Sequence, residues 1–324
     1  MSDRPLHFAV MLGGGSEGFR EYDSRVDLVE SLGYDGVWAG HGGRGYDTFQ
    51  LLTRTSTRHP RLRLGTSVTL LPLLDPVEAA RQVATLDQMS DGKLLFGAGV
   101  GGDRGPDFTI HGIDPHTRGR RMDEQLQIMR ALWAGETVDF QGEFFNVKGA
   151  LQIKPHQSRM PILIGGRGGR TPVSQRIYDR IVRWGDGWIP YITTPEYYAR
   201  GQQAIRERGG NDDLVWALVQ HAYVGTGDGQ AAIDAAVARK AADYGQAGAP
   251  PGAQAERMRP LVLAGNAEAC AQRLMEYIRL GVSEVMFNWA CPPEEIPEQI
   301  KRVAEDVIPR VRELAAAERT GAAR

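Results

Sequence analysis

Three segments of the sequence carry residue types that could do chemistry. His41 stands in the run Gly40–Gly43, and its imidazole, with an unperturbed pKa of about 6.5, can move protons near neutral pH. One glycine-rich run extends over Gly97–Gly102, and a second, with two arginines, over Gly165–Pro172. His41 is therefore a candidate acid or base, although a loop histidine can equally well bind only backbone groups.

The run Gly97–Gly102 contains the spacing GxGxxG, which alone is a weak dinucleotide-binding motif. A Rossmann fold would need a helix to open directly after it and an acidic residue about 20 positions further on. Here Asp103–Pro106 follow, and no helical pattern begins before Arg118. We therefore interpret the run as small residues that leave the end of a strand uncovered.

The run Gly165–Pro172 joins flexible backbone amides to a helix start, which is typical of an anion site. Arg167 and Arg170 could bind a phosphate or carboxylates there through paired hydrogen bonds. Further arginines share one helix face and are interpreted as a solvated surface outside the site: Arg176, Arg180 and Arg183.

Composition and charge exclude several classes of function. The 324 residues are 42% apolar with a formal net charge of −2, so no strong field attracts nucleic acid or anionic membranes. The two cysteines, Cys270 and Cys291, lack the spacing of a zinc site or a disulfide framework. Leu6–Leu12 is too short for a signal peptide, and no stretch approaches the roughly 20 apolar residues that span a bilayer. We therefore expect a cytoplasmic protein without a metal site and without nucleic-acid or membrane partners.

Short apolar runs alternate with segments of helical periodicity along the chain. The expected strands are Phe8–Leu12, Gly36–Ala39, Leu62–Leu70, Leu94–Gly99, Ile162–Gly165, Gly187–Ile192, Val215–Val224 and Glu284–Trp289. The alternation predicts an α/β fold, a single (β/α)8 TIM barrel over residues 1–317 with insertions in the βα loops, and a frayed tail at 318–324. A doubly wound open sheet is the alternative, because strand counting does not exclude it.

Two stretches interrupt this alternation. Residues 136–160 place apolar and aromatic residues around Gly142 and predict a hairpin. Residues 245–260 contain too many glycine, alanine and proline residues for a stable element and are expected to form a mobile lid or a surface loop. Near the C-terminus, an apolar stripe predicts a long helix that packs on the barrel wall or on a partner subunit: Ile300, Val303, Val307, Val311 and Leu314.

Reactive groups in a (β/α)8 barrel gather at the carboxyl ends of the strands. This rule retains His41 and adds Asp103 as a second candidate for handling a proton. His221, late on the seventh expected strand, is a weaker candidate. Three loop residues are expected to be solvated rather than catalytic: Asp107, His111 and His116.

Several segments together resemble the luciferase-like family of flavin and deazaflavin oxidoreductases, and the likeness extends over most of the chain. The matching segments are Gly33–Trp38, Leu64–Val68, Ala84–Leu94, Phe96–Gly101, Arg121 with Glu124 and Leu132-Trp133, Pro161–Gly166 and Gly185–Trp188. The resemblance implies that a reduced flavin or a deazaflavin lies in the barrel mouth, over a non-proline cis peptide that would be Ser67-Val68 here. The cofactor-binding residues that it implies are Ser67, Val68, Gly99, Val100, Gly101, Gly165, Gly166, Arg167, Arg170 and Trp188.

The chain departs from the family pattern at two places. The deazaflavin branch commonly has an acid–histidine pair after the second strand, whereas His41 stands here among glycines. Sugar-oxidising members carry a catalytic carboxylate that aligns nearest Gly102, with Asp103 beside it. Oxidation of a sugar phosphate is therefore not the expected reaction.

The resemblance predicts a deazaflavin (F-420)-dependent oxidoreductase, in which hydride passes to or from a small organic substrate while His41 or Asp103 handles a proton. A reduced-FMN-dependent monooxygenase that acts with a separate flavin reductase is the alternative, because the chain has no evident nicotinamide-binding motif. A catalytically inactive barrel that only binds a ligand is a third reading. A homodimer is expected from the family likeness alone.

Overall fold

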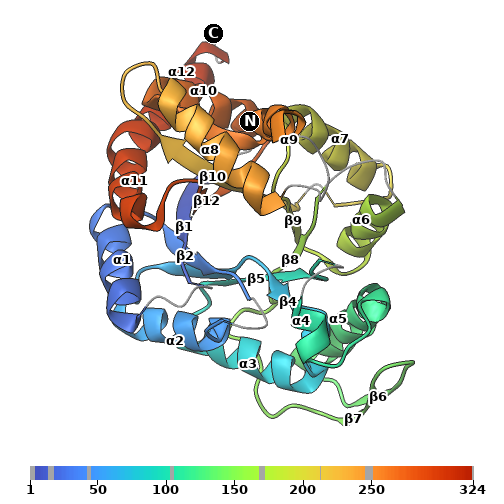
Figure 1. Cartoon of the computed structure of the whole chain (residues 1–324). Coiled ribbons are helices and arrows are strands. Elements are labelled where there is room, and N and C mark those ends of the chain that lie inside the picture. The colour runs from blue at the N-terminus through green and yellow to red at the C-terminus, as the bar shows by residue number, and fades with distance from the viewer. Residues whose placement is uncertain are drawn as a thin grey trace.

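Eight parallel strands close into a barrel in the computed structural model, which describes residues 4–13, 18–41, 45–102, 106–167, 172–211, 213–244 and 251–322. Neighbours pair around the ring in chain order, and the last strand pairs with the first (Figure 1). The strands are β1 (His7–Met11), β2 (Gly36–Ala39), β3 (Arg63–Thr66), β5 (Leu94–Gly99), β8 (Ile162–Gly165), β9 (Gly187–Ile189), β10 (Val215–Val224) and β12 (Glu284–Trp289). This closure confirms the predicted barrel and rules out the open sheet.

Each barrel strand falls within or next to one of the predicted apolar runs. The third run is split, because the ladder is interrupted after Thr66 and resumes as β4 (Thr69–Leu70), which pairs with β5. The sequence analysis missed β11 (Val262–Gly265), which pairs with His221–Val224 of β10. β10 is longer than β9, and β11 continues the pairing of β10 where β9 has ended.

Helices surround the barrel and cover the outer side of the strands (Figure 1). They are α1 (Phe19–Ser31), α2 (Thr48–Arg58), α3 (Pro76–Met89), α5 (Arg118–Ala134), α6 (Pro172–Trp184), α7 (Pro195–Arg206), α8 (Gln230–Tyr244), α10 (Ala267–Arg279), α11 (Ile296–Arg302) and α12 (Ile308–Ala322). The predicted start of α3 is confirmed, since the Asp75 carboxylate accepts a hydrogen bond from the Val77 amide at 2.9 Å and Pro76 is the first helical residue.

The insertions agree with the sequence analysis only in part. The predicted hairpin is present as β6 (Val138–Gln141) and β7 (Asn146–Gly149). The expectation of no stable element at 245–260 is wrong, because α9 (Pro251–Met258) is helical; residues 245–250 lie outside the described residues. A short helix, α4 (Pro106–Ile110), also precedes α5.

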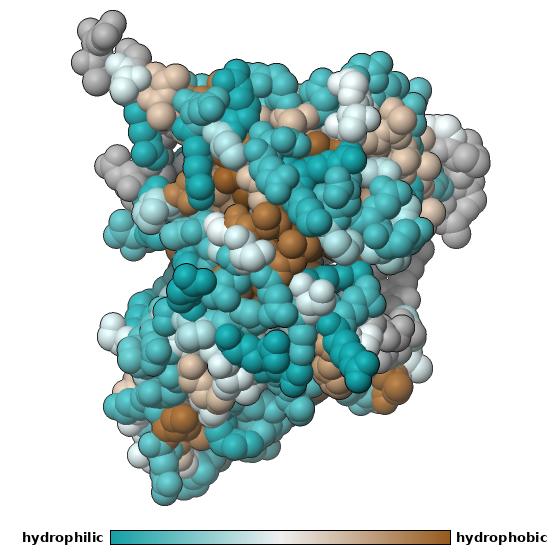
Figure 2. All heavy atoms as spheres, turned by 90° about the vertical axis from the view of Figure 1, so that its left-hand side faces the viewer, coloured by the Kyte–Doolittle hydropathy of each residue, from teal (hydrophilic) through white to brown (hydrophobic). Residues whose placement is uncertain are grey.

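The C-terminal apolar stripe packs within this chain. Ile300, Val303, Val307 and Val311 are fully buried, and the helices that carry them contact α10 and α1. α12 continues to Ala322, beyond the predicted start of the frayed tail, and Glu318 forms an ion pair with Arg279. The face that carries α1 and α11 is mostly hydrophilic, with one apolar area near its middle (Figure 2).

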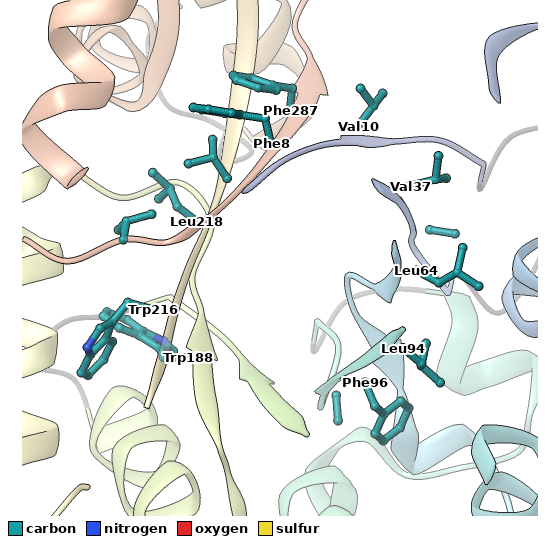
Figure 3. Close-up of a cluster of buried hydrophobic side chains, with 14 of the residues drawn as sticks. Phe8, Val10, Val37, Leu64, Leu94, Phe96, Trp188, Trp216, Leu218 and Phe287 are labelled. Atoms are coloured by element: carbon teal, nitrogen blue, oxygen red, sulfur yellow. The ribbon is translucent and has the colours of Figure 1, made fainter. Parts of the chain in front are cut away.

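Alternation along the strands divides the core into two layers. Val10, Val37 and Leu64 lie on the outer side of their strands, toward the helices (Figure 3). The alternate residues form a separate cluster inside the barrel: Ala9, Trp38, Leu95, Leu163, Ile189, Ala217, Val219 and Met286. This inner cluster occupies the barrel interior beneath the carboxyl-terminal mouth, which leaves the mouth as the expected place for a ligand.

An ion pair at the amino-terminal end of the barrel joins Arg63 of β3 to Glu284 of β12. Nη1 of Arg63 donates to both carboxylate oxygens, at 2.7 and 2.9 Å, and the Glu284 side chain is only 7% exposed. Burial raises the pKa of Glu284 above its ordinary value, and the guanidinium opposes that rise.

Replacing Arg63 with methionine is expected to destabilise the fold by about 3–5 kcal/mol near neutral pH, because a buried carboxylate loses its partner. Thermal unfolding should show a lower midpoint, and adding Glu284→Gln should restore most of it. Because burial raises the folded-state pKa of Glu284, the unpaired carboxylate lowers the stability of the fold as the pH rises through that pKa. The loss of stability in Arg63→Met should therefore be smaller in acid. Equal melting of Arg63→Met and the native chain would contradict this account.

Candidate functional site

The carboxyl end of β3 carries a non-proline cis peptide between Ser67 and Val68, as the resemblance implied. The Ser67 amide donates to the carbonyl of Ala39 at 2.9 Å, and the Val68 carbonyl accepts from the His41 amide at 3.3 Å. The Val68 side chain packs against the inner cluster. These bonds bring the ends of β2 and β3, and thus His41 and Val68, to one point of the mouth.

Two bare glycines lie on either side of the Val68 side chain. A Cβ at Gly99 of β5 would lie 2.5 Å from Val68 Cγ2, and a Cβ at Gly165 of β8 would lie 2.5 Å from Cγ1. Because a real Cβ does not approach that closely, only glycine fits at either position without a shift. The fold thus brings together three predicted cofactor residues from segments far apart in sequence.

The next two predicted positions present mainly backbone to the mouth. Val100 packs its side chain against the outer core rather than the inner cluster. Gly101 has a φ of +73°, and a Cβ there would lie 3.2 Å from the ring of Phe108 in α4. The left-handed backbone favours glycine at this position.

The side chain of Trp188, a predicted cofactor-binding residue, points away from the mouth. Its side chain is fully buried on the outer side of β9, with ring centroids 5.9 Å from Tyr178 and 5.0 Å from Tyr198. Its Nε1 donates to the carbonyl of Gly166 at 3.1 Å. Trp188 is therefore a positioning residue for the segment that follows β8.

The predicted anion site is described only in part. Arg167 is exposed, and its guanidinium carbon lies 5.7 Å from the centroid of the Tyr191 ring. Arg170 belongs to residues 168–171, which lie outside the described part of the chain. The reading of Arg180 as solvated is wrong, because its side chain is 7% exposed and pairs with Asp123 at 2.6 Å.

His41 is partly buried at the mouth. Its Nδ1 is buried and has no hydrogen-bond partner among the described residues. Burial lowers the pKa of His41, an effect that Asp47 opposes, and His111 and Asp107 also act on the charge of the ring. The imidazole is therefore neutral at pH 7 and can accept a proton. The second predicted catalytic residue, Asp103, lies outside the described residues.

The model of the family described as luciferase-like monooxygenase matches residues 5–284 of this sequence. The chain belongs to this family. Its members are flavin- or F420-dependent oxidoreductases and monooxygenases, so the resemblance found in the sequence is confirmed. Within the described residues, no helix is long and apolar enough to cross a membrane.

Among its relatives is F420-dependent glucose-6-phosphate dehydrogenase 2 of Rhodococcus jostii, which is 31% identical over 185 residues. That match covers 53% of this chain and 53% of the relative. The chain spans about half the length of the curated relatives that it matches.

Solved structures of similar fold include enzymes with either cofactor. The F420-dependent tetrahydromethanopterin reductase of Methanopyrus kandleri superposes with a TM-score of 0.76 at 17% identity, over 95% of this chain and 99% of that one. The oxygenating constituent of 3,6-diketocamphane monooxygenase from Pseudomonas putida, solved with FMN, gives 0.72 at 15% identity, over 95% and 99%. At these identities the likeness supports the luciferase-like barrel fold and leaves the cofactor undecided.

Two residues that were not predicted from the sequence contact or act on candidate histidines in the structure. Asp47 caps α2, where its carboxylate accepts from the Gln50 amide at 2.9 Å, and it also interacts electrostatically with His41. Its place before a helical segment was the one signal available. Tyr244, at the end of α8, has its hydroxyl 3.3 Å from Nε2 of His221, and no sequence pattern indicated that contact.

Proposed function

We propose that this chain is a deazaflavin (F420)-dependent oxidoreductase that transfers a hydride to or from a small organic substrate. The observation that carries the proposal is the partly buried imidazole of His41, whose Nδ1 has no hydrogen-bond partner among the described residues and whose backbone amide bonds to the Val68 carbonyl. The similarity to F420-dependent glucose-6-phosphate dehydrogenases, at 31% identity over 185 residues and 30% over 210 residues, supports this cofactor over FMN.

The described residues fit a planar cofactor at the mouth. Gly99 and Gly165 leave room for the Val68 side chain between them, and the ring of the cofactor would lie over Val68 at the mouth. The exposed guanidinium of Arg167 follows β8 directly and suits a phosphate. These residues would hold the ring and its phosphate. A bound deazaflavin supplies the hydride donor or acceptor.

His41 would handle the proton that accompanies the hydride. Oxidation of an alcohol carbon removes one hydride from carbon and one proton from oxygen, and Nδ1 of His41 would take that proton. In the reverse direction the same atom would return the proton to a carbonyl oxygen. The lowered pKa keeps His41 in the accepting form at neutral pH. The inner cluster below the mouth excludes water from the barrel interior.

Titration of the purified chain with F420 and, separately, with oxidised and reduced FMN tests the cofactor. We expect F420 fluorescence to be quenched with a Kd about tenfold or more below that of either FMN form. Binding of FMN alone would overturn the proposal in favour of a monooxygenase supplied by a separate flavin reductase. Binding of neither cofactor would indicate a barrel that only binds another ligand.

Replacing Arg167 with alanine is expected to raise the Kd of the cofactor about tenfold or more, because a charged hydrogen bond contributes about 1.5–3 kcal/mol. Fluorescence titration measures this change. Arg176 of α6 is also exposed and serves as the matched control, since Arg180 is buried in an ion pair. Equal losses in Arg167→Ala and Arg176→Ala would remove the phosphate assignment.

A further inference from the structure

A second polar group at the mouth has no role in the proposal above. His221 lies on β10 at the same parity as Ala217 and Val219, which belong to the inner cluster, so its ring faces the barrel interior. The residue is only 3% exposed. β10 stands between β9 and β12 in the barrel wall (Figure 1).

His221 belongs to a chain of ring contacts that reaches the proposed phosphate site. The Tyr244 hydroxyl lies 3.3 Å from Nε2 of His221, and the two ring centroids are 5.6 Å apart. The Tyr191 ring lies 6.4 Å from that of Tyr244, and Arg167 lies over Tyr191. These contacts therefore form a continuous series that ends at Arg167, and we call its three rings, those of His221, Tyr244 and Tyr191, the aromatic wall.

The backbone holds Tyr191 in a defined place. Ile192, the next residue, has a φ of +50°, which is unfavourable for a β-branched side chain. Tyr191 also forms a bridge with Val219 of β10, and the Val219 amide donates to the carbonyl of Pro190 at 3.1 Å. A conformation that costs free energy persists where surrounding contacts enforce it, commonly at binding sites.

One ring nitrogen of His221, Nδ1, is a candidate ligand-binding atom. Nδ1 is buried and has no hydrogen-bond partner among the described residues. An unpaired polar atom in the interior costs about 1–3 kcal/mol, so such atoms normally bind something. Burial lowers the pKa of His221 to about 3, and the nearby Lys240 is paired with Asp243 at 2.9 Å. The ring therefore stays neutral, and its surroundings carry little net charge.

We infer that Nδ1 of His221 binds the neutral oxygen of the substrate, a hydroxyl or carbonyl group whose apolar body lies against Tyr191 and Tyr244. This inference rests on the proposed function and names the substrate class for that site. In this proposal the Tyr244 hydroxyl, 3.3 Å from Nε2, is the donor to that nitrogen, which leaves the proton on Nδ1 and makes Nδ1 the donor to the substrate. His221 is a specificity-determining residue, on the β10 side of the mouth, whereas His41 follows β2.

Cyclohexanone, a neutral carbonyl probe, tests the inference, because its binding should change the ¹⁵N resonance of Nδ1 directly. The chain, labelled with ¹⁵N-histidine and saturated with F420, is titrated with cyclohexanone and, separately, with cyclohexane carboxylate. The His221 resonances are assigned by their loss in His221→Asn. We expect cyclohexanone to move the Nδ1 resonance and the carboxylate to leave it unchanged. A resonance moved only by the carboxylate, or by neither probe, overturns the inference.

Two substitutions test which of the two ring nitrogens of His221 binds the probe. Asparagine places its amide near the position of Nδ1, and glutamine places its amide near that of Nε2. We expect His221→Asn to bind cyclohexanone within about threefold of the native chain and His221→Gln to lose about tenfold, the effect of one hydrogen bond. The opposite order would overturn the inference, because it would make the bond to Tyr244 the important one.

Tyr244→Phe provides a test that a folding defect does not obscure. It removes only a hydroxyl from a residue that is 38% exposed, and we expect about a threefold loss of cyclohexanone affinity because the tautomer of His221 is no longer set. Tyr197→Phe, on α7 and 50% exposed, is the matched control. No change in Tyr244→Phe would overturn the role of the pair.

F420 titration of the same variants separates the two proposals. Normal F420 binding with unchanged cyclohexanone affinity in His221→Gln refutes only the role of His221. Absence of F420 binding in the native chain refutes the proposed function, and the ¹⁵N titration of the cofactor-free chain still decides whether Nδ1 binds the ketone.

Discussion

Replacing Gly99 with alanine is expected to lower turnover with F420 on the order of a hundredfold. The new Cβ would lie 2.5 Å from Cγ2 of Val68, so Val68 must move by about an ångström to restore an ordinary contact. The opposite methyl group, Cγ1, faces Gly165, where even an added Cβ would lie only 2.5 Å away, so the side chain has little room to rotate. A displacement of this size in a cofactor cradle typically costs about 10²-fold in rate. Steady-state reduction or oxidation of F420, followed by absorbance, measures the loss.

Gly102→Ala is the matched control for Gly99→Ala. A Cβ at Gly102 would meet no atom of the described residues within 4 Å, and Gly102 lies at the end of the same segment. We expect this variant to bind F420 and to turn over as the native chain does. Native activity in Gly99→Ala, with its thermal midpoint retained, would show that the cofactor does not use the surface around Val68.

Replacing His41 with glutamine is expected to lower kcat by about 10²–10⁴-fold while the Kd of F420 changes little. General acid–base catalysis by a positioned group contributes an effect of this size. The His41 backbone amide, which bonds to the Val68 carbonyl, is retained in the variant, so the cradle itself should persist. Stopped-flow measurement of the hydride-transfer step, beside fluorescence titration of F420, separates the two effects.

The pH profile provides the decisive signature of His41. Because burial lowers its pKa, the native enzyme should retain the proton-accepting form below pH 6.5 and lose oxidation activity only in more acidic solution. That acidic limb should be absent from the residual activity of His41→Gln. The same limb in both proteins would assign the proton to another group. Asp107 is one candidate, because it interacts electrostatically with His41.

The sequence predicted the barrel because the pattern of a buried strand and the pattern of a helix can each be recognised within a short segment. Runs such as Leu94–Gly99 and Glu284–Trp289 are rich in apolar residues and buried on both faces, as parallel strands in a barrel are, and the segments between them repeat at helical spacing. β11 was missed because its residues, Val262–Gly265, form a short run without a distinct pattern. α9 was missed because proline and glycine are tolerated in the first turn of a helix, where few backbone bonds are lost.

Local composition also identified the glycine-rich strand ends, but it did not predict which way individual side chains point. Trp188 and Ile189 are both apolar and adjacent on β9, so alternation requires that they face opposite sides without indicating which side is inner. The closed barrel placed Ile189 inside and Trp188 among the outer aromatic rings. The strand sequence therefore did not predict that Trp188 faces away from the mouth.

The sequence by itself determined the order of the strands, the barrel class, and which residue types stand at the strand ends. Only the tertiary structure decided which of them meet. Val68 lies between Gly99 and Gly165, and His221 contacts Tyr244, because barrel closure and the ends of the helices bring together segments separated by tens of residues. Such distances depend on strand register and packing over the whole ring, and no local pattern encodes them.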